Sequence, residues 1–324
     1  MMLRLLVSRL GQAVLVMLAV SAVSFGLFRF VGDPVASMTR ENATVEEKAE
    51  LRRSLGLERP VVAQYGEFLG RVLRGDLGIS YRNQRPVATL LAERLPATLE
   101  LVLVATVLSL ALGIPLGVLC ALKPDGVAAR LVQAVSLVGI STPTFVTGIV
   151  LILVFAVTLG WLPSFGRGET VPLGPWSTGF LTWSGWKALV LPGITLALYQ
   201  LTLIMRLVRA ELIDVLSSDY IRFARARGLP ARRIHFTLAL RNALMPVITV
   251  TGLQIGSLIA FAIVTETVFQ WPGLGLLFIQ AVGFSDVPVM AAYLLLVGLL
   301  FVAINTVVDL LYAVVDPRLR LRAA

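Results

Sequence analysis

Six apolar runs of about 20 residues or more constrain the fold of this chain more than any other feature of its sequence. Because an α-helix rises 1.5 Å per residue, about 20 apolar residues cross a hydrocarbon core about 30 Å thick. Backbone polar groups find no water there, so we expect helices; barrel strands would alternate in shorter segments. The predicted spans are Leu10–Phe30, Ala97–Leu122, Leu131–Leu159, Ala188–Leu207, Ala243–Thr265 and Val289–Tyr312.

The composition supports an all-α integral membrane protein with about six transmembrane helices. Of its 324 residues, 57% are hydrophobic and only 15% are charged, whereas soluble domains carry about a quarter charged residues. The formal charge of +9 favours basic loops beside an anionic leaflet over nucleic-acid binding. Cys120 and His235 are the only residues of their types, which excludes an intrachain disulfide and a His/Cys metal cluster.

The distribution of basic residues predicts the topology. Arginines crowd the segments that lie inside if the N-terminus is cytoplasmic, whereas the short outer loops carry only Arg167 and Lys187. We therefore expect a multi-pass protein of the cell (inner) membrane with both termini cytoplasmic. We expect a tail and first transmembrane helix over 1–30, a long outer loop over 31–96, and a five-helix core over 97–324 that includes a cytoplasmic segment, 206–241.

The long outer loop carries two helix signals. Thr44 followed by Glu47 is typical of a capping box, which predicts a helix over Thr44–Ser54. Gln64–Leu73 predicts a second, amphipathic helix, and Gly75–Gly78 predicts a turn. We expect a small cap over the outer mouth of the protein.

Single residues in the spans carry further predictions. Gly113 and Gly117 are four residues apart and predict close packing against a neighbouring helix. Pro143 predicts a tilt or kink near the start of the third span. Glu266 and Asp309 lie near span ends, where we expect water or a partner to reach them.

The cytoplasmic segment 206–241 is too long for a simple helix–helix connection. Ser218 and Asp219 predict the start of a short helix and Gly228 its end, and Pro230 predicts a new helix over Ala231–Ala243. The helical repeat places four residues of the short helix on one face. From the residues alone, a lipid-bound interfacial helix and a docking element for a cytoplasmic partner are equally supported. The four residues are Tyr220, Phe223, Ala224 and Arg227.

The run DYIRFARARGLPARRIHFTLALRNALMP resembles the cytoplasmic signature of the binding-protein-dependent ABC importer permeases. Ala224, Gly228 and Pro246 match its small residue, glycine and later proline. Arg222 stands where the general signature has glutamate, and the spacing from Gly228 to Pro246 is longer. Both departures suit the dipeptide/oligopeptide (and nickel) branch. The resemblance implies a coupling helix that docks on an ATPase subunit, with these residues in the contact: Asp219, Tyr220, Arg222, Phe223, Ala224, Arg225 and Gly228.

Further motifs extend this resemblance over nearly the whole chain, in the order of the same branch. They include ERLPATLEL, GIPLGV, ETVFQWPGLG and VDLLYAVVDPRLR. The chain resembles the first of two permeases in such systems. That implies a type I ABC importer permease fold and a pathway, formed with a second homologous permease, for short peptides. An extracytoplasmic solute-binding protein delivers the peptides and two ATPase subunits drive transport, with membrane lipid around the complex and no nucleic acid.

The sequence itself shows no ATPase motif. None of Lys48, Lys123 and Lys187 follows a glycine, so the phosphate-binding pattern G-x-x-x-x-G-K-[ST] is absent. We expect a transport subunit and not an enzyme, with no cofactor of its own, and with ATP and magnesium bound by the partner ATPases. Three alternatives stay open: an ion-coupled secondary transporter, disfavoured by the nearly uncharged spans; a membrane scaffold; and a permease for nickel complexes, glutathione or oligosaccharides.

Overall fold

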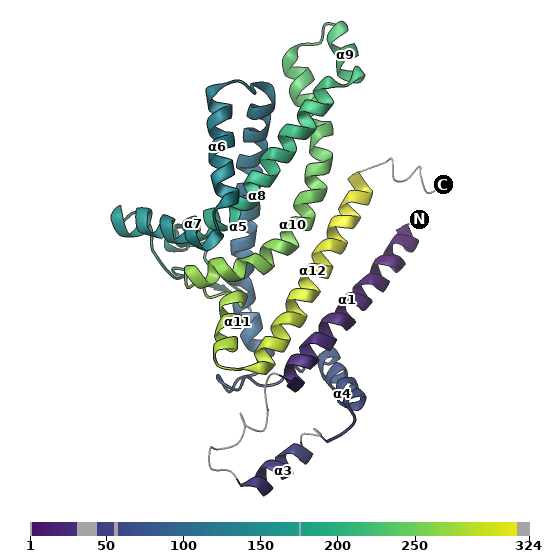
Figure 1. The fold of residues 1–324 in the computed structure, drawn as a ribbon, viewed down its shortest axis with the longest axis vertical. Coiled ribbons are helices and arrows are strands. Elements are labelled where there is room, and N and C mark those ends of the chain that lie inside the picture. Colours follow the sequence, from purple (N-terminus) through teal and green to yellow (C-terminus); the bar gives the residue numbers. More distant parts are fainter. Residues whose placement is uncertain (1, 31–43, 55–57, 175, 316–324) are drawn as a thin grey trace.

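The computed structural model describes residues 2–30, 44–54, 58–174 and 176–315, and these residues are mainly helical (Figure 1). A single two-stranded hairpin is the only sheet among them. The elements are α1 (Met2–Phe30), α3 (Val45–Ser54), α4 (Val61–Leu73), α5 (Val87–Leu122), α6 (Val127–Ser141), α7 (Thr144–Leu151), η1 (Ile152–Thr158), β1 (Val171–Leu173), β2 (Trp176–Thr178), α8 (Trp183–Ser217), α9 (Asp219–Ala226), η2 (Arg233–Ala239), α10 (Leu240–Val268), α11 (Leu274–Gly283) and α12 (Val287–Val315).

The count of about six spans is confirmed with one change in form. Five helices in the described ranges are long and apolar enough to cross a membrane, and a bent pair makes a sixth if counted as one span. The predicted third span is this pair: α6 and the helix over 144–158 meet at 112°. Pro143 has no N–H to continue α6 and stands as the N-cap of α7. The predicted kink at Pro143 is confirmed, but it is sharper than a bend within one helix, because α6 ends and α7 begins there.

Several helices are longer than their predicted apolar runs, and α5 and α8 are two examples. α5 begins at Val87 and not at Ala97, after the N-cap Pro86. α8 runs from Trp183, and its N-cap Thr182 accepts a hydrogen bond of 3.0 Å from the Gly185 N–H. Hydropathy marks only the apolar part of a helix, so the more polar turns beyond it were assigned to loops.

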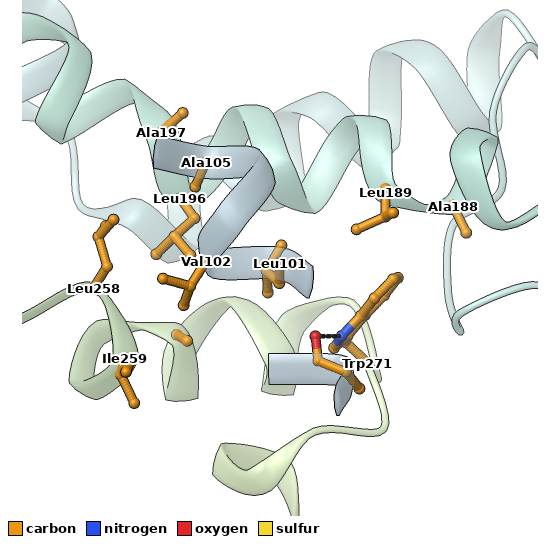
Figure 2. Close-up of a cluster of buried hydrophobic side chains, with 12 residues drawn as sticks. Leu101, Val102, Ala105, Ala188, Leu189, Leu196, Ala197, Leu258, Ile259 and Trp271 are labelled. Atoms are coloured by element: carbon orange, nitrogen blue, oxygen red, sulfur yellow. Dashed lines mark hydrogen bonds between the residues drawn. The ribbon is translucent and has the colours of Figure 1, made fainter. Parts of the chain in front are cut away.

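The core lies where α5, α8 and α10 meet (Figure 2). α5 contributes Leu101 and Val102, and α8 and α10 contribute Leu196 and Leu258 to the same cluster. Trp271 lies at one end of the cluster, where its indole N–H donates to the carbonyl oxygen of Ala97 at 2.9 Å. This bond joins the connection after α10 to α5.

Close contact between α5 and α8 depends on the two glycines predicted to pack. A Cβ at Gly117 would lie 2.7 Å from both the Met205 oxygen and the Val208 Cβ. At Gly113 it would lie 3.0 Å from the Ile204 Cγ2. The predicted packing role is confirmed, since a side chain at Gly117 would force α8 to shift and one at Gly113 would press on Ile204.

Glu266 of α10 is buried, which corrects the expectation that water or a partner reaches it. Its carboxylate accepts hydrogen bonds from the Thr98 hydroxyl at 2.6 Å and from the Leu276 N–H at 3.0 Å. Thr98 in turn accepts from the Leu274 N–H at 2.8 Å. These bonds satisfy donors in the first turn of α11, as helix N-termini require. The side chain of Asp309 lies outside the described residues.

An ion pair holds the β1–β2 hairpin against α5. Arg167 donates to the Glu100 carboxylate from Nε at 3.0 Å and from Nη2 at 2.7 Å, with side-chain exposures of 7% and 2%. Arg167 Nη2 also donates to the Ser177 carbonyl at 2.6 Å, and Glu100 accepts from the Gly179 N–H at 3.1 Å. The ion pair thus attaches the β1–β2 hairpin to α5. From the sequence, Arg167 was placed in a short outer loop.

A third polar contact fixes the end of the long 31–96 segment. Asp286, before α12, is buried and accepts from the Ser80 hydroxyl and from the Tyr81 N–H, the latter at 3.1 Å. The Arg82 guanidinium lies over the Phe284 ring, 3.4 Å from its centroid. Residues 80–82 are therefore attached to the connection between α11 and α12.

The two ends of the bundle differ (Figure 1). α9 projects at one end, and α1 begins and α12 ends on the side toward it. α3, α4 and α11 lie toward the opposite end. α1 packs on α12 and α4, at the edge of the bundle. The predicted capping box is confirmed: Thr44 N–H donates to Glu47 at 2.9 Å, and Glu47 N–H to the Thr44 hydroxyl at 3.2 Å.

Candidate coupling site

α9 lies at the tip of a helical hairpin made by α8 and α10 (Figure 1). Ser218 ends α8 and begins α9, with extended backbone angles that turn the chain between them. Its hydroxyl donates back to the Val215 carbonyl at 2.6 Å, so its side chain does not cap α9. Asp219 supplies the acid in the first turn, which favours the helix N-terminus electrostatically.

Gly228 ends this short helix as predicted. Its φ of +72° is a left-handed conformation that glycine adopts readily. The Gly228 N–H donates to the Arg225 carbonyl at 2.9 Å, and the Leu229 N–H to the Ala224 carbonyl at 3.3 Å. Pro230 then starts the next helical segment, η2, whose wide turns were not predicted.

One face of α9 is buried within the chain itself. Ile221 and Ala224 are the buried residues of this helix, and both belong to a cluster with residues of α5, α8, η2 and α10. Because this cluster joins three spans, α9 is held by side-chain packing as well as by its two ends. The other buried members are Val118, Ala121, Ile204, Val208, Leu212, Ile234, Ala239, Ala243 and Val247.

The opposite face is open and combines aromatic with charged groups. Tyr220 is 52% exposed and Phe223 is 63% exposed. The Arg227 guanidinium lies 5.7 Å from the centroid of the Phe223 ring. Arg222 pairs with Asp219 at 3.3 Å, an exposed i,i+3 pair that contributes little to stability. Arg225 is exposed as well.

The residues predicted for this site lie partly on the open face of α9 and partly on its buried face. The structure brings Tyr220 and Phe223 to the open face, but it turns Ala224 inward, so the prediction of a shared face is wrong for Ala224. A helical wheel places Ala224 between Tyr220 and Ile221, and the packing of Ile221 decides its direction. Ile221 was missed, although it is the one branched aliphatic side chain in DYIRFARAR.

The open face of α9 suits binding to another macromolecule. The described residues contain no group of three His, Cys, Asp or Glu side chains that could hold a metal ion. Exposed aromatic rings beside arginines are the groups enriched at protein interfaces.

Both halves of the chain match known protein families. Residues 113–321 match the family described as "Binding-protein-dependent transport system inner membrane component". Residues 2–102 match "Binding-prot-dependent transport system membrane comp, N-term".

Curated relatives match over nearly their full length. A di/tripeptide transport system permease protein of Pseudomonas aeruginosa is 39% identical, covering 98% of this chain and 99% of the relative. A dipeptide transport system permease protein of Escherichia coli is 38% identical, with the same coverage of each. Both relatives are permeases and not enzymes by name.

A solved structure shares the fold. The methionine ABC transporter MetNI in an inward-facing conformation contains a chain that superimposes with a TM-score of 0.53 at 22% identity. The match covers 68% of this chain and 93% of that one. This likeness confirms the expected type I importer permease fold.

Proposed function

Because the chain belongs to the family of binding-protein-dependent transport system inner membrane components, we propose that it forms, with a second homologous permease, a pathway that imports short peptides. It is a membrane permease component of an ABC importer, a class that works with other subunits. The peptide substrate rests on the relatives, which are named as dipeptide and di/tripeptide permeases and match nearly the whole chain.

The open face of α9 is the observation that carries the coupling role. We propose that Tyr220, Phe223, Arg222 and Arg225 contact one of two ATPase subunits, which bind ATP and magnesium. Burying the exposed parts of two aromatic rings contributes roughly 1–2 kcal/mol each. Ala224, being buried, supports the helix from within. Gly228 sets the exit angle of the chain.

The arrangement of the ends supports the predicted topology. α9, the start of α1 and the end of α12 lie toward one side of the bundle (Figure 1), and the arginines of 206–241 lie there as well. On the positive-inside rule we propose that this side is cytoplasmic. An extracytoplasmic solute-binding protein then meets the opposite end, where α3, α4 and α11 lie.

Copurification tests the docking proposal. The tagged chain is expressed with its ATPase subunits and second permease, in native form and as Tyr220→Ala/Phe223→Ala. We expect the double variant to lose most of the ATPase while keeping the second permease. Phe165→Ala is the matched control, because Phe165 is 60% exposed but lies far along the chain from α9. Equal ATPase recovery in all three forms would contradict the proposal.

Substrate is tested separately with the reconstituted complex and its binding protein. We expect dipeptides and tripeptides to stimulate ATP hydrolysis and to accumulate in vesicles. Stimulation by a nickel complex, glutathione or an oligosaccharide, without stimulation by peptides, would show that the substrate is that solute and not a peptide. The assignment of the chain as a permease would be unaffected. Uptake that follows an ion gradient and needs no ATP would contradict the coupling proposal.

A further inference from the structure

α4 carries an apolar stripe that, in the described chain, is exposed at its two ends and partly buried at Leu69. Val62 is 82% exposed and Leu73 is 86% exposed, and Leu69 lies between them on the same side of the helix by the 3.6-residue repeat. The opposite side carries the polar residues. Those are Gln64, Glu67 and Arg71.

A second apolar face of α4, beside the stripe, attaches the helix to α1. The Tyr65 hydroxyl lies 2.7 Å from the Ser21 hydroxyl and 3.3 Å from the Leu18 carbonyl oxygen. The Phe25 ring contacts the rings of Tyr65 and Phe68, with centroids 5.5 and 5.8 Å apart. α4 therefore has a fixed position against α1, and its apolar stripe is presented beside that contact.

The contact also fixes the depth of α4. The apolar stretch of α1 that could span a membrane includes at least Arg9–Leu27. Ser21 precedes Leu27 by about 9 Å of helix at 1.5 Å per residue, so it lies at least that far inside the end of the stretch. Amphipathic helices that lie in a membrane interface bury their apolar face by about 5–10 Å. The Tyr65 hydroxyl thus reaches the depth at which such a helix lies.

We propose that α4 is an interfacial membrane helix whose stripe of Val62, Leu69 and Leu73 contacts lipid acyl chains, in the leaflet opposite the α9 end. α1, on which α4 packs, also exposes apolar side chains, since Leu15 and Val23 are 70% and 60% exposed. A helix suits this position because its backbone groups bond internally. The polar side faces water, where Glu67 pairs with Arg59 at 3.5 Å.

Spin labelling of single cysteines in the complete complex, reconstituted in phospholipid vesicles, tests the position of α4. Cys120, which is buried, is first replaced by alanine. Nitroxide labels are then placed by Val62→Cys and Leu73→Cys on the stripe, and by Glu67→Cys on the polar side. Glu50→Cys, on α3, is the matched control in water. Collisions with oxygen, which concentrates in lipid, and with a water-soluble nickel chelate are measured at each site.

We expect labels at 62 and 73 to collide often with oxygen and several-fold less with the nickel chelate than the label at 50. The label at 67 should resemble the label at 50. Frequent nickel collisions at 62 and 73 would place the stripe in water and overturn the proposal. Few collisions with either reagent would show that protein covers the stripe. If this happens only after the solute-binding protein is added, that protein is the occupant; if it happens without it, the second permease is.

Discussion

Replacing Arg167 by methionine should open the β1–β2 hairpin without unfolding the spans. The arginine makes two hydrogen bonds to Glu100 and one to the Ser177 carbonyl, all at 3.0 Å or less. In Arg167→Met the carboxylate of Glu100, 2% exposed, keeps only the Gly179 N–H at 3.1 Å. Removing one partner of a buried ion pair costs about 3–5 kcal/mol.

Hydrogen exchange followed by mass spectrometry measures this cost locally. The amide of Gly179 is a direct reporter, because it exchanges only when its bond to Glu100 opens. A cost of 3–5 kcal/mol corresponds to an opening equilibrium larger by roughly 10²-fold to 4 × 10³-fold. We expect peptides that cover 167–182 to exchange faster by about that factor, while peptides from the middle of α8 stay unchanged.

A second substitution makes the reasoning refutable. Glu100→Gln in the Arg167→Met background removes the uncompensated charge, so the double variant should exchange more slowly than Arg167→Met alone. If Arg167→Met changes exchange by less than threefold, or if the double variant is faster than the single one, the ion pair does not hold the hairpin closed.

Two further predictions concern packing and protonation. Gly117→Ala should cost about 1–3 kcal/mol of stability, because its Cβ would lie 2.7 Å from the Val208 Cβ. The thermal midpoint of unfolding in detergent should therefore be lower than that of the control Gly11→Ala, where a Cβ meets nothing within 4 Å. Equal midpoints would contradict this prediction. Burial, aided by the Asp286 carboxylate, raises the pKa of Tyr81 from 10.0 to about 12. The neutral phenol therefore stabilises the attachment of residues 80–82 below pH 10 and loses this effect as pH rises toward 12. A titration of tyrosine absorbance against a Tyr81→Phe reference should show the shift, and Asp286→Asn should lower this pKa; a Tyr81 that titrates near 10 would refute the assignment.

The sequence predicted those structural features that are determined by residues adjacent along the chain. The Thr44–Glu47 capping box and the turn at Gly228 each depend on a few adjacent positions. Their physical causes are a cap and a left-handed backbone. Such causes operate within one helix or turn, so the sequence alone reveals them.

Contacts between distant segments were missed. Glu266 meets Thr98 across 168 positions, and its position near a span end suggested exposure. Nothing local shows that the following α11 folds back and supplies N–H donors to the carboxylate. The same holds for Arg167 and Glu100, because charge counting placed Arg167 in an outer loop without naming a partner.

The short helix α9 shows both outcomes in one element. Its start, its end and its aromatic residues were predicted, but the inward direction of Ala224 was not. Direction depends on which neighbour offers an apolar surface, and that surface is built from α5, α8 and α10. The repeat of a helix gives relative angles between side chains and no absolute orientation.

The burial of Ile221 and Ala224 has a consequence for the order of assembly. An eight-residue helix is far below the length at which helices persist alone in water, so α9 is formed only while its neighbours enclose it. A newly made chain therefore displays Tyr220 and Phe223 in the geometry described above only after its own spans have packed. ATPase recruitment through α9 would then follow membrane folding, and unpacked permeases would be left without an energy source.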